Sequence, residues 1–576
     1  MSFEDVAKGV LKKSIRSAVC IDDMFEQPYM IAEEVEARNK ELSERDGGEV
    51  HLDSKVPRAL YSSFRESGIC DLDIYNFKSF EESWHPEYML NNKDLLVIDW
   101  ELEGKNNYES TIKILREAIQ TNKYPNVPFI IIYTYEPKEH FQSIMEQIVS
   151  NFHPYNKEGI SVSKLYSILK SDFNGYFEEE FLEDEFIDWF NQQRKSFFEF
   201  WSTPNSKARE IITGEIYSSF NFEFSVKEKK KHKTGNKFEK NLRKLFSLDD
   251  NEKCIEQLYY LSIVINSDGI FKFDRINTSD IGVKINNTVL TLFSKEKSPG
   301  KGVKPEDVFD SFSNLVCNDP HNFLSLLSLE MKDRLRDDLT LISDKISSLD
   351  ERAFFHHMNS YKSRSENFKN EFFDFLLRGW VDEIETYNFN NLPDVFSVVD
   401  EYAQNHNYEK LDGNNFKNEI GELGLKLSTV EIDDRLERTP TLRFGDILID
   451  REANEYYLCI TPACVCVDAC KKVDNNFYFI KSNDVKEFER SSAAKKIEID
   501  YYSIVKDNST LFAIKWECKP FTLYIEQNNL KNLKTHYSSR SIELEYVTTT
   551  KENFAQRIAN QSFTYGTSIG IDLPHI

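Results

Sequence analysis

Apolar runs alternate with amphipathic segments over the first 170 residues of the chain. In residues 3–15 the apolar positions Phe3, Val6, Val10 and Leu11 fall near one face of a helix. The pattern that follows predicts strands at 17–23, 69–77, 94–100, 128–134 and 159–165, and helices at 58–68, 110–120 and 139–152. This order is typical of a parallel sheet with helices on both faces. It predicts a flavodoxin-like, doubly wound α/β fold.

Residues 26–56 interrupt this order. They are polar, rich in Glu and Gly, and show no strand pattern after a short helical signal. We expect them to be an insertion within an α/β domain that spans residues 1–170.

The pattern changes again further along the chain. Residues 171–430 are mostly helical in period and predict one or two packed helical units, although β-type runs at 269–276 and 287–295 interrupt them. Short β-branched and aromatic runs separated by turns fill residues 431–576, and the last stretch begins as a helix. The chain is therefore expected to be multidomain, with an α/β domain, a mostly α-helical middle region and an all-β C-terminal domain that is a small barrel or sandwich.

Composition supports several soluble cores. The chain has 576 residues, of which 40% are hydrophobic and 13% aromatic, and this length predicts about three domains. No run of 18 apolar residues predicts a membrane span, and the N-terminus lacks the apolar run of a signal peptide. Nine cysteines at irregular spacing favour reduced thiols, so we expect a cytoplasmic protein.

Charge argues against nucleic-acid binding through the surface as a whole. The formal net charge is −25, but one basic cluster stands out between residues 227 and 244, where Lys229, Lys230, Lys231 and Lys233 lie close together. This cluster predicts either a contact with nucleic acid or an acidic partner, or a solvated loop that leads into a helix. The loop is the favoured interpretation.

Acidic side chains follow the predicted strands of the first domain. Asp22 and Asp23 end the first strand, Asp99 ends the strand at 94–100, and Thr134 ends the next one. In an open parallel sheet these carboxyl ends form the ligand crevice. Three carboxylates that meet there favour a bound Mg²⁺, and a carboxylate can attack phosphorus to give an aspartyl phosphate.

The segments CIDDMF, DLLVIDWEL and PFIIIYT carry a resemblance to the receiver domains of response regulators. The resemblance implies that Asp22, Asp23 and Asp99 hold Mg²⁺, that Asp99 accepts a phosphoryl group and that Thr134 senses it. The family also has a lysine after the fifth strand. Lys164 is the candidate for it, and Lys138, just after the fourth strand, is the alternative.

The polar insertion and the absence of Met-Pro after Asp99 set this sequence apart from compact receivers. Both features are similar to those of divergent receiver-like domains that precede effector or regulatory regions in bacterial conflict systems, including anti-phage defence. The resemblance implies a protein partner, such as a kinase or another defence component. In divergent members the phosphorylation chemistry can be lost while the fold persists as an interaction surface.

A cysteine cluster is the second candidate site. Cys459, Cys464, Cys466 and Cys470 lie within twelve residues, and thiolates at such spacing can bind Zn²⁺. The spacing matches no usual zinc motif, and alternation along a strand would point Cys464 and Cys466 into a core. Core packing is the favoured interpretation. The histidines at 140, 153, 356 and 357 have no partners at ligand spacing and are interpreted as structural.

Three hypotheses on function remain open at this point. The first is a signalling or regulatory protein whose receiver-like domain responds to a partner. The second is an effector enzyme or a component that acts on nucleic acid, with its site in residues 171–576. The third is a structural subunit of a larger complex.

Overall fold

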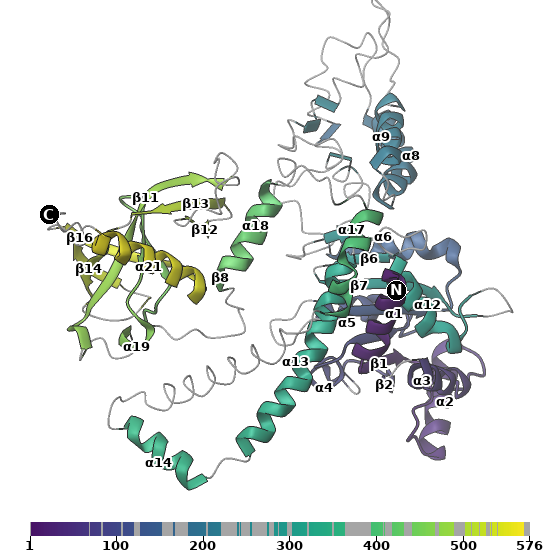
Figure 1. Cartoon of the computed structure of the whole chain (residues 1–576). Coiled ribbons are helices and arrows are strands. Elements are labelled where there is room, and N and C mark those ends of the chain that lie inside the picture. Colours follow the sequence, from purple (N-terminus) through teal and green to yellow (C-terminus); the bar gives the residue numbers. More distant parts are fainter. Residues whose placement is uncertain are drawn as a thin grey trace, which may run out of the picture. The chain divides into compact units, whose positions relative to one another are not determined.

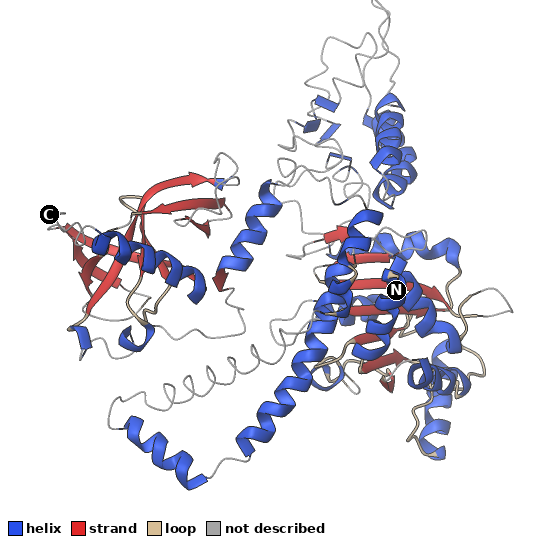
Figure 2. Cartoon of the chain, viewed as in Figure 1, coloured by secondary structure: helices blue, strands red, loops and turns tan. Residues whose placement is uncertain are grey.

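The computed structural model of the chain contains two compact units (Figures 1 and 2). One unit comprises Met1–Leu341 with Asn388–His406, and the other comprises Ile342–Tyr387 with Asn407–Ile576. The structure describes residues 2–67, 70–81, 84–104, 107–119, 127–152, 165–166, 183–202, 206–219, 239–240, 242–243, 254–255, 258, 273–275, 282–285, 287–296, 302–318, 322–347, 351–362, 393–406, 408, 417–430, 441–466, 472–488, 502–507, 510–517, 519–525, 530, 533–537 and 540–568.

A seven-stranded sheet organises the first unit. Its order is β2-β1-β3-β4-β7-β6-β5, where the bounds are β1 (Ser17–Asp22), β2 (Asp71–Asn76), β3 (Leu95–Ile98), β4 (Phe129–Thr134), β5 (Phe273–Arg275), β6 (Gly282–Ile285) and β7 (Thr288–Ser294). The first five strands in this order pair in parallel, whereas β6 and β5 continue the sheet antiparallel. Every residue of β3, β4 and β7 is buried, as expected for parallel strands covered on both faces.

The fifth parallel strand differs from the sequence prediction. Most of the predicted strand 159–165 lies outside the described residues, and β7 occupies the place beside β4, in register from Phe129↔Val289 to Thr134↔Ser294. The β-type run at 287–295 was instead assigned to the helical middle region. The sheet therefore includes strands that lie beyond residue 170, where the sequence pattern predicts the end of the α/β domain. Pattern alone does not reveal this, because neighbours in a sheet need not be neighbours in sequence.

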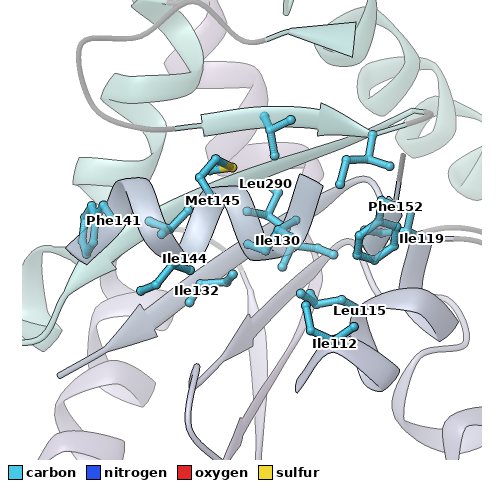
Figure 3. Close-up of a cluster of buried hydrophobic side chains, with 14 of the residues drawn as sticks. Ile112, Leu115, Ile119, Ile130, Ile132, Phe141, Ile144, Met145, Phe152 and Leu290 are labelled. Atoms are coloured by element: carbon cyan, nitrogen blue, oxygen red, sulfur yellow. The ribbon is translucent and has the colours of Figure 1, made fainter. Parts of the chain in front are cut away.

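Alternate residues of the strands point into two apolar layers, one on each face of the sheet. One layer contains Val19, Ile21, Leu96 and Ile98 and is covered by α5 (Glu109–Ile119) and α6 (Phe141–Phe152); Figure 3 shows the part of it around Ile130, Ile132 and Leu290. The other contains Ala18, Cys20, Leu95 and Val97 and is covered by α1 (Phe3–Ser14), α3 (Lys55–Ser67) and α12 (Val308–Asn318). The period of two along each strand accounts for this division.

The predicted polar insertion contains a helix, α2 (Ala32–Asp46), that ends at Gly47 in the left-handed conformation with φ 72°. Leu42, a residue of this helix, is fully buried. The buried side chain of Arg38 donates from Nε to Asn76 Oδ1 at 3.0 Å and from its terminal nitrogen to the Phe77 carbonyl at 2.8 Å. These bonds attach α2 to the end of the edge strand β2.

A long helix, α13 (Phe323–Ser347), is attached to the sheet at the edge where β3 begins. The fully buried carboxylate of Asp94, just before β3, accepts hydrogen bonds from Lys332 at 2.8 Å and from Arg336 at 2.7 and 2.9 Å. The backbone N–H of Arg16, just before β1, donates to the same carboxylate at 3.1 Å. Through Asp94, α13 is therefore linked to the N-terminal ends of β1 and β3, the two strands whose C-terminal ends carry the acidic residues.

The remaining described helices of the chain are α4 (Pro86–Met89), η1 (Lys138–His140), α8 (Glu183–Ser202), α9 (Ser206–Ser219), η2 (Pro305–Asp307), α14 (Glu351–Lys362), α16 (Asp394–Ser397), α17 (Val399–Asn405), α18 (Lys417–Ser428), α19 (Ala463–Cys466) and α21 (Glu552–Ser568). Within the part of the chain that the structure describes, no helix combines the length and apolar character that crossing a bilayer requires.

The second unit carries an antiparallel sheet. The order β12-β13-β11-β10-β9-β16-β15, with β14 beside β11 and β8 beside β16, uses β8 (Thr429–Val430), β9 (Asp446–Asp450), β10 (Glu455–Cys459), β11 (Asn476–Glu487), β12 (Tyr502–Asp507), β13 (Thr510–Trp516), β14 (Phe521–Tyr524), β15 (Leu533–Tyr537) and β16 (Arg540–Thr550). Both faces are apolar: Ile558 and Ala559 of α21 pack on one core, and Ile420 and Leu425 of α18 pack on another. The mostly β C-terminal region agrees with the sequence prediction.

The cysteine segment folds differently from the prediction. Residues 463–466 form the short helix α19 rather than a continued strand, so strand alternation does not apply there. Cys459 and Cys466 are buried in one core, and the Cys466 thiol contacts the Thr461 carbonyl at 3.2 Å. Burial and the neighbouring Cys466 raise the pKa of the Cys459 thiol well above its usual value. This favours a neutral thiol at Cys459, and the burial of both residues agrees with packing in a core. Cys470 and the side chain of Cys464 lie outside the described part.

Candidate functional site

Three carboxylates meet at the carboxyl ends of two adjacent strands. β1 ends with Asp22 and is followed by Asp23, while Asp99 directly follows β3, the neighbouring strand. One oxygen of each carboxylate lies within 4.8 Å of the others, and all three residues are buried. The structure thus brings together the three acidic residues that the sequence predicted as metal ligands.

The lysine of this site is Lys295, which directly follows β7. Its Nζ lies 2.6 Å from Asp22 Oδ2 and 2.9 Å from Asp99 Oδ2, and its side chain is 3% exposed. Its backbone N–H donates to the Thr134 carbonyl at 2.6 Å, which extends the β4–β7 ladder by one residue. Sequence reasoning missed this lysine, although the run NTVLTLFSK that ends with it has the pattern of a buried strand.

The structure describes one of the two lysines named from the sequence, and it places that one elsewhere. Lys164 lies outside the described residues. Lys138 begins the exposed turn η1, beyond the end of β4. The role that the resemblance assigns to a lysine after the fifth strand therefore corresponds, by position, to Lys295.

Backbone hydrogen bonds orient the acidic side chains. The N–H of Met24 donates to Asp22 Oδ1 at 2.8 Å, and the N–H of Trp100 donates to Asp99 Oδ1 at 2.7 Å. Each of these two carboxylates therefore uses one oxygen for the backbone and the other for Lys295. Such bonds fix the carboxylates in one orientation before any ligand binds.

An arginine from α2 completes the charged groups of the site. Arg45 places a terminal nitrogen 2.6 Å from Asp23 Oδ2, and the Asp23 side chain is only 2% exposed. Arg45 also holds the more exposed carboxylate of Asp46 through two hydrogen bonds, at 2.8 and 3.1 Å. Sequence reasoning did not connect Arg45 with Asp23, because the two lie 22 residues apart and Arg45 belongs to the segment interpreted as an insertion.

The balance of burial and charge sets the protonation of the site. Burial acts to lower the pKa of Lys295, but the carboxylates of Asp22 and Asp99 outweigh it and hold that pKa above its usual value. Burial raises the pKa of Asp22 despite the nearby ammonium group. Burial and the charge of Asp22 raise the pKa of Asp23, against the opposing effect of Arg45. Burial and the repulsion between the acidic groups thus oppose the ionisation of Asp22 and Asp23, whereas Lys295 and Arg45 favour it.

Thr134 lies at the end of β4, where the sequence placed it. It is buried, and its hydroxyl oxygen accepts a hydrogen bond from the Glu136 N–H at 3.3 Å. Its strand partner is Ser294, the residue before Lys295. Thr134 therefore shares the sheet edge with Lys295 and Asp99. The ring of Tyr135, the next residue, lies 4.8 Å from the Lys295 ammonium.

The donor set fits a hard divalent cation. Carboxylate oxygens are the ligands that Mg²⁺ prefers, and it is held in proteins by one or two carboxylates together with waters and phosphate oxygens. Asp22, Asp23 and Asp99 supply three such groups, with one ligand oxygen of each within 4.8 Å of the others. A cation there would share these oxygens with Lys295 and Arg45, or displace one of the two side chains.

The structure describes only part of the other candidates from the sequence. Lys229, Lys230, Lys231 and Lys233 lie outside the described residues, and so does His153. His140 pairs with Glu136 on an exposed turn.

The comparisons with known proteins identify the first domain. Residues 14–196 match the family model of the response receiver domain, which includes Asp22, Asp23, Asp99 and Thr134 but ends before β7 and Lys295. No curated protein and no solved structure matches the chain. Receiver domains act in signalling and regulation and typically interact with other proteins. The N-terminal part of this chain is therefore a response receiver domain of the kind found in response regulators of two-component signalling.

Proposed function

We propose that this chain is a cytoplasmic signalling protein that accepts a phosphoryl group on Asp99 and passes the resulting change to a partner. The observation that carries the proposal is the position of Lys295, whose ammonium bridges Asp22 and Asp99 at 2.6 and 2.9 Å beside Asp23. A buried lysine between the acceptor and a metal-ligand carboxylate is suited to neutralise the charge of an incoming phosphoryl group.

The chemistry requires a nucleophile and compensation of charge. A carboxylate oxygen of Asp99 attacks phosphorus, the bond from phosphorus to the donor's leaving group breaks, and the leaving group departs with the electron pair. A divalent cation held by Asp22, Asp23 and Asp99 would supply positive charge to the transferring group. Lys295 supplies a second positive charge, and Trp100 holds the acceptor carboxylate in place through its N–H. The hydroxyl of Thr134 is the group on the neighbouring strand that would respond to the product.

Helix α13 is the route by which we propose the change leaves the domain. Its side chains bind Asp94, the residue just before β3, and Asp99 directly follows the same four-residue strand. A shift of β3 would therefore reach α13 through a buried ion pair. The helix extends from Phe323 to Ser347, past Leu341 at the limit of the first unit.

An acyl-phosphate assay tests the proposal. The full chain is incubated with Mg²⁺ and acetyl phosphate, and the acid-stable but alkali-labile adduct is measured by intact mass. We expect an adduct on the native chain, none on Asp99→Asn, and an unchanged amount on Asp71→Asn, whose carboxylate is 78% exposed at the sheet edge. No adduct on the native chain together with no Mg²⁺ binding would refute the proposal.

A role in anti-phage defence is the finer part of the proposal. It rests on the resemblance of the divergent receiver pattern to receiver-like domains of bacterial conflict systems. Expression of the native chain with its neighbouring genes should protect a bacterial host against phage, and Asp99→Asn should reduce that protection. Equal protection by the two forms would separate defence from phosphorylation, and no protection by either would refute the defence role.

A further inference from the structure

We propose that Arg45 gates the loading of the acidic site with a divalent cation: its guanidinium bonds the carboxylates of Asp23 and Asp46, and it releases Asp23 and stays on Asp46 when the cation binds. The inference rests on the part of the proposed function in which Asp22, Asp23 and Asp99 bind a cation. It adds a control element that comes from α2, outside the strands that build the site.

Two carboxylates hold the guanidinium at once. Its contact with Asp23, at 2.6 Å, is made to a side chain that is 2% exposed, whereas Asp46 is 33% exposed. Asp46 receives two hydrogen bonds from Arg45, at 2.8 and 3.1 Å. Arg45 can therefore release Asp23 and still keep an ion pair. Release without such a second partner would leave the guanidinium with solvent alone.

The position of α2 relative to Asp23 is fixed by the fold. Asn76 donates from one amide nitrogen to the carbonyls of Asp23 and Phe25, at 2.8 and 2.9 Å. Its amide oxygen accepts the bond from Arg38 of α2. One buried side chain thus links the helix to the backbone that carries Asp23. Arg45 is held in reach of the site by these contacts, so its pairing with Asp23 is a built feature of the domain.

The loop after β3 borders the same arginine. Gly104 has φ 92°, and a Cβ atom there would lie 3.5 Å from Arg45 Nε and 3.4 Å from Asp46 Oδ1. This loop begins at Asp99, the residue that follows β3. The guanidinium consequently lies between α2 and the loop that starts with the proposed phospho-acceptor.

Electrostatics gives the direction and size of the effect. A cation at Asp23 and the guanidinium repel each other and compete for the same oxygens, so removal of the Arg45 charge should strengthen cation binding. At separations of about 5 Å and intermediate effective dielectric, the repulsion predicts a change in Mg²⁺ affinity of roughly tenfold or more. Arg45→Lys, which keeps the charge but loses the fork of donors, should change the affinity less.

Titration of the full chain with Mg²⁺ tests the gate. Binding is measured by calorimetry and by tryptophan fluorescence, since Trp100 directly follows Asp99 and its backbone N–H donates to that carboxylate. We expect Arg45→Gln to bind Mg²⁺ at least about tenfold more tightly than the native chain. Arg65→Gln, a control on α3 whose exposed arginine pairs with Asp71 at 3.2 Å, should bind as the native chain does.

Asp46→Asn gives an independent test with the opposite sign. Without its second partner Arg45 should stay on Asp23, and Mg²⁺ affinity should fall. In the double variant Arg45→Gln/Asp46→Asn most of that fall should disappear, because there is no longer a guanidinium to hold in place. An equal fall with and without Arg45 would mean that Asp46 acts through its own charge, and this would overturn the gate.

The outcomes separate the gate from the proposed function. If the native chain binds Mg²⁺ and forms the Asp99 adduct while Arg45→Gln binds no more tightly, the gate is refuted and the proposed function stands. If Arg45→Gln binds Mg²⁺ and the native chain does not, the gate is supported and the native chain needs a signal to open it. If neither form binds Mg²⁺, both proposals fail. Far-UV circular dichroism of each variant confirms that the compared proteins are folded.

Discussion

Replacement of Lys295 by Met should destabilise the receiver domain strongly. The substitution preserves the length of the side chain but removes an ammonium group that lies 2.6 and 2.9 Å from two buried carboxylates. Asp22, Asp23 and Asp99 would then face one another with Arg45 as the remaining positive partner. Removal of one member of a buried ion pair typically costs about 3–5 kcal/mol, because the other charge is left buried without compensation. We expect a loss of this size in the free energy of unfolding.

Hydrogen–deuterium exchange of the full chain measures this loss locally, which avoids the ambiguity of multidomain unfolding. Exchange of β1 and β3 should accelerate in Lys295→Met, and a second substitution, Asp22→Asn, should restore part of the protection. Lys40→Met is the control, since that lysine is 79% exposed on α2 and should change stability by less than about 0.5 kcal/mol. Protection of β1 and β3 equal to that of the native chain would refute the view that Lys295 neutralises the site.

Three further outcomes are expected. Asp94→Asn should destabilise the attachment of α13 by about 3 kcal/mol, seen as faster hydrogen exchange of that helix. Burial alone would raise the pKa of Asp94, but the bonds from Arg336 and Lys332 hold that pKa below 3.8. The stability that Asp94 contributes should therefore be present above about pH 4 and be lost as the pH falls further. Gly302→Ala should destabilise the loop after β7, because Gly302 has φ 134° and the new Cβ would lie 2.8 Å from backbone atoms. Gly9→Ala, at an open position of helix α1, should instead stabilise the domain by about 0.5–1 kcal/mol in thermal unfolding. The fragment 1–196 should lack cooperative unfolding by circular dichroism; cooperative unfolding would show that β4 does not need β7.

The strands of the receiver domain could be predicted because their burial is visible in the sequence. β3 and β4 are continuous apolar runs, and each ends in a polar residue that the structure places at one edge of the sheet. The acidic site followed from the same reasoning, since the carboxyl ends of parallel strands meet. The meeting of Asp22, Asp23 and Asp99 required only that β1 and β3 be parallel neighbours, as the doubly wound fold predicts.

The cationic half of the site could not be predicted in this way. Lys295 is separated from Thr134 by 160 residues, and nothing in the local pattern of β7 says which strand it joins. Arg45 lies on a helix that buries a single leucine and the stem of Arg38, so its apolar stripe is too weak to show where the helix packs. Both cations act through tertiary pairing, for which one sequence holds no periodic signal.

The separation of the two halves has a physical consequence for how the domain is completed. Asp22, Asp23 and Asp99 are brought together by β1 and β3, but three buried carboxylates repel one another until Lys295 arrives. Because β7 is also the strand that pairs with the fully buried β4, the same pairing event extends the sheet and brings Lys295 to the site. Loop-closure entropy rises only slowly with length, so the long connection between β4 and β7 costs little more than a short one. The long segment between β4 and β7 is therefore compatible with a receiver site whose lysine comes from far along the chain. The negative charge of Asp22, Asp23 and Asp99 itself favours the pairing of the strand that is followed by Lys295.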